Sequence, residues 1–397
     1  MHRKSTGTID DNNSKSCGEN SDEDKMLENS CDFGPIFDSS DFESTIFIKS
    51  KLNRHSKSNS TPLNIEPKIH VKKASDIRHR SLGGEARREA QKFVKNAVIV
   101  ARRISRYGYQ LMNHWDLPDW LRDNVYLHHF HRPQLATFRL CFKSMFSIHT
   151  ETGNIWTHLI GLAILFFSMI YIFARPFFTT DGYPYYPKGF KEYLSFAAFF
   201  AGGCSCLTFS WLFHTLYCHS PKINKLFAKL DYCGISLLIC GSMIPVFYFS
   251  YYCHVSLMIT YMVIATFMAM LCIIASLMDI MSTPKFRPIR GCIFLAFGLS
   301  SVVPIFHHFI IYPSSYTLEV TQLYMLIIMG SLYVTGCLIY MFLIPERYFP
   351  GKLNIVAHSH QIFHVCVVVA AMIHLYAICK MSSFWVARGR SCPGGEL

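Results

Sequence analysis

Five polar side chains lie within or beside long apolar stretches of the chain, where ionisable groups are costly and mark functional sites. They are Ser210, His214, Asp231, His360 and His364. Residues four apart share one face of a helix, so Ser210 neighbours His214 and His360 neighbours His364. Three imidazoles with a free fourth position form the ligand set of a catalytic zinc site. We therefore predict that the three histidines bind Zn²⁺, although iron or another divalent ion also suits imidazole.

The carboxylate and the hydroxyl of this set are the candidate catalytic groups. Zinc lowers the pKa of a bound water to about 7. Asp231, close to the ligands but not one of them, is expected to accept a proton from that water or to hydrogen-bond it. Ser210 is expected to orient the water or to donate to a developing oxyanion. The alternative is a group of histidines at headgroup level that hydrogen-bond lipid phosphates or backbone carbonyls.

Three further polar residues, His149, Glu151 and His158, fall at the same predicted depth. They either belong to the site or accompany an N-terminal helix cap made by Thr152 or Asn154. Other histidines are not expected to be ligands, because they lie on other helix faces, in an aqueous connector or at the opposite leaflet: His219, His254, His307, His308, His358 and His374.

The elements that must position these groups are membrane-spanning helices. Of the 397 residues, 51% are hydrophobic and only 16% are charged, against about 25% charged in soluble domains. Crossing a bilayer takes about 20 apolar residues, and continuous runs without alternation indicate helices rather than barrel strands. Seven runs qualify: Ile155 to Ala174, Tyr193 to His214, Tyr232 to Tyr252, Val255 to Met278, Gly291 to Ile311, Val320 to Leu343 and Ile362 to Ile378. We predict an all-α membrane protein, a seven-transmembrane helical bundle.

Basic residues indicate how this bundle is oriented. Lys and Arg are concentrated ahead of the first span and recur after the second, fourth and sixth spans. Since positive charge favours the cytosolic side, we predict a cytosolic N-terminus and an extracellular C-terminus in the plasma membrane. The five polar groups then share the inner leaflet. In either orientation they lie at one depth, because the second span ends on the side of the membrane where the third and seventh spans begin. Cys253 and Cys392 would both lie outside, where a disulfide between them is feasible.

Composition divides the chain into four parts. Residues 1–85 are predicted to be a disordered cytosolic segment, without the apolar core of a signal peptide. Residues 86–142 are a predicted cytosolic juxtamembrane helical region. Its basic amphipathic helix over 86–113 would lie on anionic headgroups or pack beneath the membrane domain, and no nucleic-acid-binding module is recognisable. Residues 143–380 form the seven-helix membrane domain, and 381–397 an extracellular tail.

Several long segments resemble a known family. Over roughly residues 115–380 the chain closely resembles the adiponectin receptors, which belong to the progestin and adipoQ receptor family. The matching segments are LPDWLRDNVYLHHFHRP (117–133), FRLCFKSMFSIHTETGNIWTHLIG (138–161), FSWLFHTLYCHS (209–220), LDYCGISLLICGS (230–242) and SHQIFHV (359–365).

This resemblance implies seven spans with the predicted orientation and an intramembrane zinc ion near the inner leaflet. Its motifs put the zinc ligands at His214, His360 and His364, the water-contacting aspartate at Asp231 and the nearby serine at Ser210. The family is associated with hydrolysis of ceramide to sphingosine and fatty acid, coupled to lipid and glucose metabolism. The resemblance also implies an adiponectin-like extracellular protein ligand.

Three functional hypotheses stay open. The first is a receptor with zinc-dependent ceramidase activity, acting on ceramide or a related membrane lipid. The second is a non-enzymatic signalling receptor in which the zinc is structural. The third, a channel or transporter, is weaker because the polar groups are confined to one side of the membrane. The oligomeric state is not defined by the sequence, which is compatible with a homo-oligomer.

Overall fold

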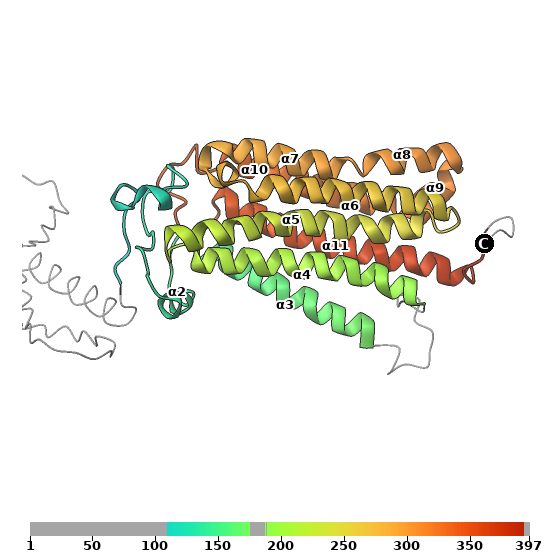
Figure 1. The fold of residues 1–397 in the computed structure, drawn as a ribbon, viewed down its shortest axis with the longest axis horizontal. Coiled ribbons are helices and arrows are strands. Elements are labelled where there is room, and N and C mark those ends of the chain that lie inside the picture. Colours follow the sequence, from blue (N-terminus) through green and yellow to red (C-terminus); the bar gives the residue numbers. More distant parts are fainter. Residues whose placement is uncertain (1–108, 175–186, 188, 393–397) are drawn as a thin grey trace, which may run out of the picture. The chain divides into compact units, whose positions relative to one another are not determined.

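The computed structural model describes residues 109–174, 187 and 189–392. Within these residues the regular structure is helical (Figure 1). The predicted disordered segment 1–85 and most of the predicted amphipathic helix over 86–113 lie outside the described residues.

Seven helical segments are long and apolar enough to cross a membrane, which confirms the predicted seven-transmembrane helical bundle. They run along a common direction in Figure 1. In chain order they are α3 (Thr152–Ala174), α4 (Phe190–Leu216), α5 (Pro221–Ser250), α6 (Val255–Leu277), the pair α7 (Arg287–Leu299) and α8 (Val302–Ile311), α10 (Leu323–Phe342) and α11 (Ser359–Ala387). The shorter helices α2 (Phe138–Ser144) and α9 (Ser314–Thr321) precede the first and sixth of these segments.

Two predicted spans are altered by local breaks. The fifth is divided into α7 and α8, where the hydroxyls of Ser300 and Ser301 donate to carbonyl oxygens of the preceding turn at 2.6 and 2.8 Å. Such bonds compete with the regular helix ladder. The sixth was predicted to begin at Val320, which instead lies in α9. Gln322 separates α9 from α10 in a left-handed conformation with φ 50°.

Two other helices extend beyond their predicted apolar runs. Helix α5 begins at Pro221 rather than Tyr232, because the Ser220 side chain accepts a first-turn backbone N–H and proline suits the first helical position. Helix α11 continues past Ile378 to Ala387. Polar residues at these ends ended the apolar pattern but did not end the helices.

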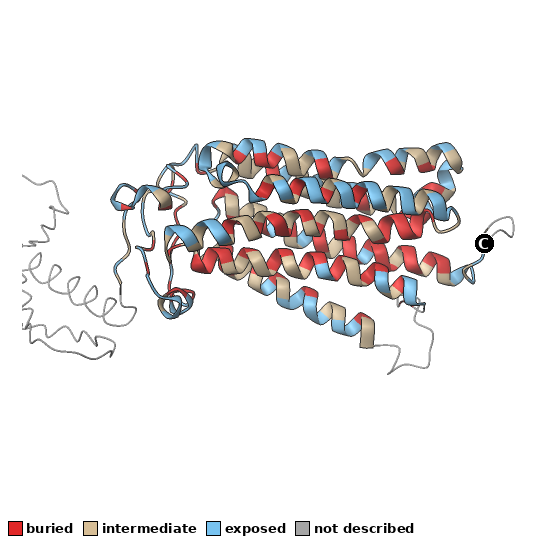
Figure 2. Ribbon diagram, viewed as in Figure 1, coloured by how far each residue is buried: buried red, intermediate tan, exposed pale blue. Residues whose placement is uncertain are grey.

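The centre of the bundle is α5. In its most apolar stretch 72% of the residues are buried, against 17% in α6. Figure 2 shows buried residues concentrated on α4, α5 and α11, with more exposed surface on α6, α7 and α8. Helices α4 and α5 approach at glycines. A Cβ at Gly202 would meet the Leu237 carbonyl oxygen, and one at Gly241 the Ala198 carbonyl oxygen. Small residues at contacts of this kind allow membrane helices to pack backbone to backbone.

At one end of the bundle, the segment that precedes α3 forms a second, smaller core with the C-terminal end of α4. Buried Arg132 joins the two. Its guanidinium donates to the Ser144 hydroxyl at 2.7 Å and to the carbonyls of Thr215 and His214 at 3.0 and 2.5 Å. These contacts satisfy carbonyls that a helix end leaves free. The apolar part of this core is Leu117, Leu121, Leu135, Cys141, Leu216 and Cys218.

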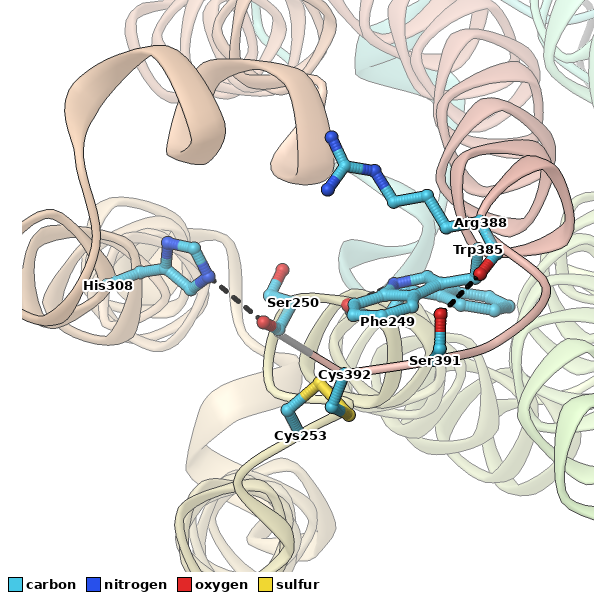
Figure 3. Close-up of a disulfide and its surroundings, with 8 residues drawn as sticks. All are labelled: Phe249, Ser250, Cys253, His308, Trp385, Arg388, Ser391 and Cys392. Atoms are coloured by element: carbon cyan, nitrogen blue, oxygen red, sulfur yellow. Dashed lines mark hydrogen bonds between the residues drawn. A yellow bond between two sulfur atoms is a disulfide. The ribbon is translucent and has the colours of Figure 1, made fainter. Parts of the chain in front are cut away.

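The opposite end is closed by a disulfide between Cys253, in the α5–α6 connection, and Cys392, after α11 (Figure 3). The structure thus contains the bridge that the sequence only made feasible. Beside it, the Trp385 indole donates to the Phe249 carbonyl at 2.8 Å. The chain before Cys392 is also fixed by an ion pair, in which Arg390 Nε lies 2.5 Å from Glu192 Oε1.

Candidate metal centre

Three histidines from two distant helices converge near the end of the bundle that carries Arg132. His214 lies in the last turn of α4, and His360 and His364 lie at the start of α11. One ring nitrogen from each lies within 4.8 Å of the others. The two Nε2 atoms of His214 and His360 are 3.1 Å apart. Among the residues that the structure describes, this is the one group of three or more His, Cys, Asp or Glu side chains so arranged.

The outer ring nitrogens of two of these histidines are held by protein acceptors. His214 Nδ1 donates to Glu151 Oε2 at 2.7 Å. His364 Nδ1 donates to the Asn154 carbonyl at 3.1 Å. Each neutral ring then presents its Nε2 lone pair to the cluster, with the tautomer inferred from these partners. Bonds of this kind are the usual support for metal-bound imidazoles, so the donor set fits a divalent ion.

Glu151 is the supporting residue whose role sequence reasoning left undecided. It directly precedes α3, and Asn154 Nδ2 also donates to its Oε2, at 2.8 Å. Thr152, one of the predicted capping residues, accepts the His149 backbone N–H at 2.9 Å. The His149 N–H lies ahead of α3, so this bond does not satisfy a first-turn amide of the helix as the predicted cap would. Glu151, in contrast, contacts the histidine cluster directly. A carboxylate four residues ahead of an apolar span was the available signal.

His149 holds the backbone of Glu151 in place through hydrogen bonds. Burial, with the nearby positive charge of Arg132, lowers the pKa of His149 well below its ordinary value. The neutral ring donates from Nε2 to the Ser144 carbonyl at 3.0 Å, and its Nδ1 accepts the Glu151 backbone N–H at 3.1 Å. The start of α3 is thereby tied to α2.

His158, the third undecided residue, stacks on a candidate ligand instead of joining the cluster. Its ring lies parallel to that of His364, with the centroids 3.5 Å apart. Both of its nitrogens are buried and lack a hydrogen-bond partner among the described residues. This packing fixes the plane of the His364 ring from the side of α3.

The candidate catalytic residues lie beside the cluster but outside it. Asp231 in α5 and Ser210 in α4 are buried, and their side chains interact with each other. Both contribute to the wall of a cavity that also includes His360 and His364. The structure therefore brings the predicted carboxylate, hydroxyl and imidazoles to one region, with the carboxylate contributed by a third helix.

The cavity has a volume of about 750 Å³. Beyond the polar end, its wall consists mainly of apolar side chains from α5, α7, α8, α10 and α11. Along α10 it extends from Tyr340, whose ring is 5.2 Å from that of His360, to Leu323. The length of α10 from Leu323 to Tyr340 is about 25 Å at 1.5 Å per residue. A long cavity that is lined mainly by apolar side chains and has imidazoles at one end suits a hydrocarbon chain.

Comparison with known proteins identifies the family. The sequence pattern of the family described as "Haemolysin-III related" matches residues 146–375, which include all five predicted site residues. The chain belongs to this family. It is 42% identical over 306 residues to the adiponectin receptor protein of Drosophila melanogaster, covering 77% of this chain and 66% of that one.

Two further relatives place the chain in the same group. It is 43% identical over 285 residues to the progestin and adipoQ receptor-like protein 1 of Caenorhabditis elegans, covering 72% of this chain and 63% of that protein. It is 34% identical to the ADIPOR-like receptor IZH2 of Saccharomyces cerevisiae, covering 77% of this chain and 92% of that one. The predicted adiponectin-receptor resemblance is confirmed. The chain spans slightly less than two thirds of the fly and nematode proteins.

Proposed function

We propose that this adiponectin-receptor-like membrane protein is a zinc-dependent hydrolase of a lipid amide, with ceramide as the substrate class. The observation that carries the proposal is the position of the three-histidine cluster at one end of a long apolar cavity. A lipid enters such a cavity with its chain among the helices and its amide beside the imidazoles. Sites of this kind, largely apolar with a few converging polar groups, are typical of ligand-binding cavities.

The chain's own residues account for the remaining chemistry. A zinc ion held by His214, His360 and His364 would supply Lewis-acid polarisation and a water of lowered pKa. Asp231 accepts the proton of the attacking water and returns it to the amine as the carbon–nitrogen bond breaks. Ser210 donates to the carbonyl oxygen as negative charge develops there. The products are a fatty acid and a sphingoid amine.

The membrane orientation enters this proposal as well. We propose that the end carrying Cys253 and Cys392 is extracellular and that the metal end faces the cytosol of a plasma-membrane receptor. Disulfides persist in oxidising compartments, and the basic connectors lie at the metal end. An adiponectin-like protein ligand would then meet the disulfide end, and the lipid chemistry would occur near the other leaflet.

Release of sphingosine by the purified full chain in lipid nanodiscs tests the activity. We expect turnover that tracks bound metal, with His364→Ala inactive and low in zinc by elemental analysis. His254→Ala is the matched control, because His254 lies at the opposite end of the bundle, outside the cluster. Equal turnover in the unmodified protein and His364→Ala would overturn the proposal.

The second candidate is a receptor in which the metal is structural. One observation favours it, since the ligands and their supports join α4 and α11 to the segment around the start of α3. A metal bound there would hold these parts together whether or not it catalysed a reaction. Chelation that lowers the thermal midpoint of a protein without measurable turnover would support this function in place of the first.

A further inference from the structure

A second polar position lies deeper in the same cavity. Ser242 in α5, Tyr333 in α10 and His374 in α11 all contribute to its wall. The step from His364 to His374 along α11 corresponds to about 15 Å at 1.5 Å per residue. Polar groups at membrane depth are expensive and are usually retained for a function.

Among the residues that the structure describes, one nitrogen of His374 lacks a complementary partner. The ring is buried, with Nε2 3.0 Å from the Ser242 carbonyl oxygen and Nδ1 3.0 Å from Met329 Sδ. A carbonyl oxygen only accepts, so the neutral ring carries its proton on Nε2 and donates it there. Nδ1 is then an acceptor that faces a thioether sulfur, which has no proton to donate. His374 therefore retains an unused acceptor in the cavity wall.

Tyr333 supplies the complementary group. Its hydroxyl is buried and has no hydrogen-bond partner among the residues that the structure describes. Tyr333 follows Met329 by about one helical turn, so the two side chains share a face of α10. Tyr333, Met329 and His374 all contribute to the wall of the same cavity, and the Met329 sulfur is the atom that lies against His374 Nδ1. Methionine is unbranched and flexible, which makes it the neighbour most easily displaced by a ligand.

We propose that Tyr333 and His374 bind a hydroxyl group carried near the middle of a long hydrocarbon chain. The ligand hydroxyl donates to His374 Nδ1 and accepts from the Tyr333 hydroxyl, while the Met329 side chain moves aside. One ligand atom satisfies both buried groups. The ligand class is a long-chain lipid hydroxylated in mid-chain. The inference rests on the proposed function only in taking the cavity as the lipid-binding site, and needs no metal chemistry.

Competition binding to the purified full chain tests this directly. The probes are octadecanoic acid, the same acid with one hydroxyl at mid-chain, and the same acid with a hydroxyl at its far end, each displacing a fluorescent fatty acid. We expect the mid-chain hydroxyl to tighten binding about tenfold, as two new hydrogen bonds allow. The terminal hydroxyl should give no gain. Equal affinity for the three acids, or no binding of any, would overturn the inference.

A single-atom variant assigns the effect to its residue. Tyr333→Phe removes only the hydroxyl, so we expect most of the mid-chain gain to disappear while octadecanoic acid binds as before. Tyr324→Phe is the matched control, because Tyr324 is on the same helix but is 55% exposed and is absent from the cavity wall. An undiminished gain in Tyr333→Phe would contradict the assignment. The comparison on the unmodified protein holds even if this variant fails to fold.

The two proposals fail separately. Loss of sphingosine release with the hydroxyl preference intact would overturn the hydrolase proposal alone. Turnover of ceramide with no preference among the three acids would overturn only the hydroxyl-binding position.

Discussion

His214 Nδ1 lies 2.7 Å from Glu151 Oε2, across 63 residues of sequence. The pair joins the end of α4 to the residue before α3, and it defines which nitrogen of His214 faces the other two imidazoles. The Glu151 carboxylate therefore determines the tautomer of His214, a candidate metal ligand from a distant part of the chain. This contact makes the segment ahead of the first span part of the candidate metal centre.

Glu151→Gln should weaken metal binding. The amide has the same shape but no charge, and it can turn its NH₂ toward His214, so the favoured tautomer is lost. Changes in such supporting partners typically cost about 10–100-fold in metal affinity, which titration against a chelating dye measures. Glu319→Gln is the control, since Glu319 is largely exposed near Arg388. Unchanged affinity in Glu151→Gln would contradict the role assigned to this pair.

Asp231→Asn should separate metal binding from hydrolysis. Asp231 lies outside the ligand cluster, so zinc content measured by elemental analysis should stay normal. Turnover should fall by about 10²–10⁴-fold, the usual contribution of a general base, with a smaller change in KM. Asp279→Asn serves as the control because Asp279 is an exposed residue paired with Lys229. Retained turnover in Asp231→Asn would remove this residue from the mechanism.

Gly202→Ala should destabilise the bundle. The added methyl group meets the Leu237 carbonyl oxygen, so α4 and α5 must separate. Overpacking of this kind costs about 1–3 kcal/mol, measurable as a lower thermal midpoint in detergent. Gly330→Ala in α10 is the matched control, since nothing lies within 4 Å of its added Cβ. Alanine favours a helix over glycine by up to about 1 kcal/mol, so the control should be neutral or more stable. A similar loss in both variants would argue against the close approach.

Cys253→Ser and Cys392→Ser should each destabilise the fold, and the double variant should be no worse than either single one. Both remove the same cross-link, whose typical contribution is about 2–4 kcal/mol. Cys292→Ser, at an exposed free cysteine, is the control. Additive losses in the double variant would show that the thiols act independently.

The same cysteines test the membrane orientation. After mild reduction of intact cells, a membrane-impermeant maleimide should label Cys253 and Cys392 if that end faces outside. Labelling only after the cells are permeabilised would reverse the proposed orientation.

Several features of the fold were predictable because they depend on local composition. A run of apolar residues must form a helix in a bilayer, so the seven spans could be located from length and apolarity. Because successive spans alternate in direction, the end of the second span and the start of the seventh lie on one side, which predicted that His214 and His364 are at one depth. The division between α7 and α8 was not predictable in this way, because Ser300 and Ser301 are compatible with an uninterrupted apolar run.

The parts of the site that the sequence left undecided or did not indicate depend on contacts between distant segments. Glu151 next to Thr152 has the appearance of ordinary helix-cap chemistry, and nothing local indicates that its carboxylate extends to α4. The Tyr333 hydroxyl has no hydrogen-bond partner among the described residues, and nothing in the sequence indicates this, since tyrosine is common in membrane spans. The contact of Glu151 and the role proposed for Tyr333 both depend on tertiary packing, which residue type alone does not predict.

Two of the three imidazoles in the cluster belong to α11, which follows the other described helices along the chain and is therefore synthesised after them. A growing polypeptide that has inserted only its earlier helices holds a single histidine of the set and has no complete donor arrangement. A metal ion held by this cluster would therefore be bound only after translation has delivered Ser359 and the helix that follows. We expect metal content to distinguish fully assembled molecules from those truncated ahead of α11.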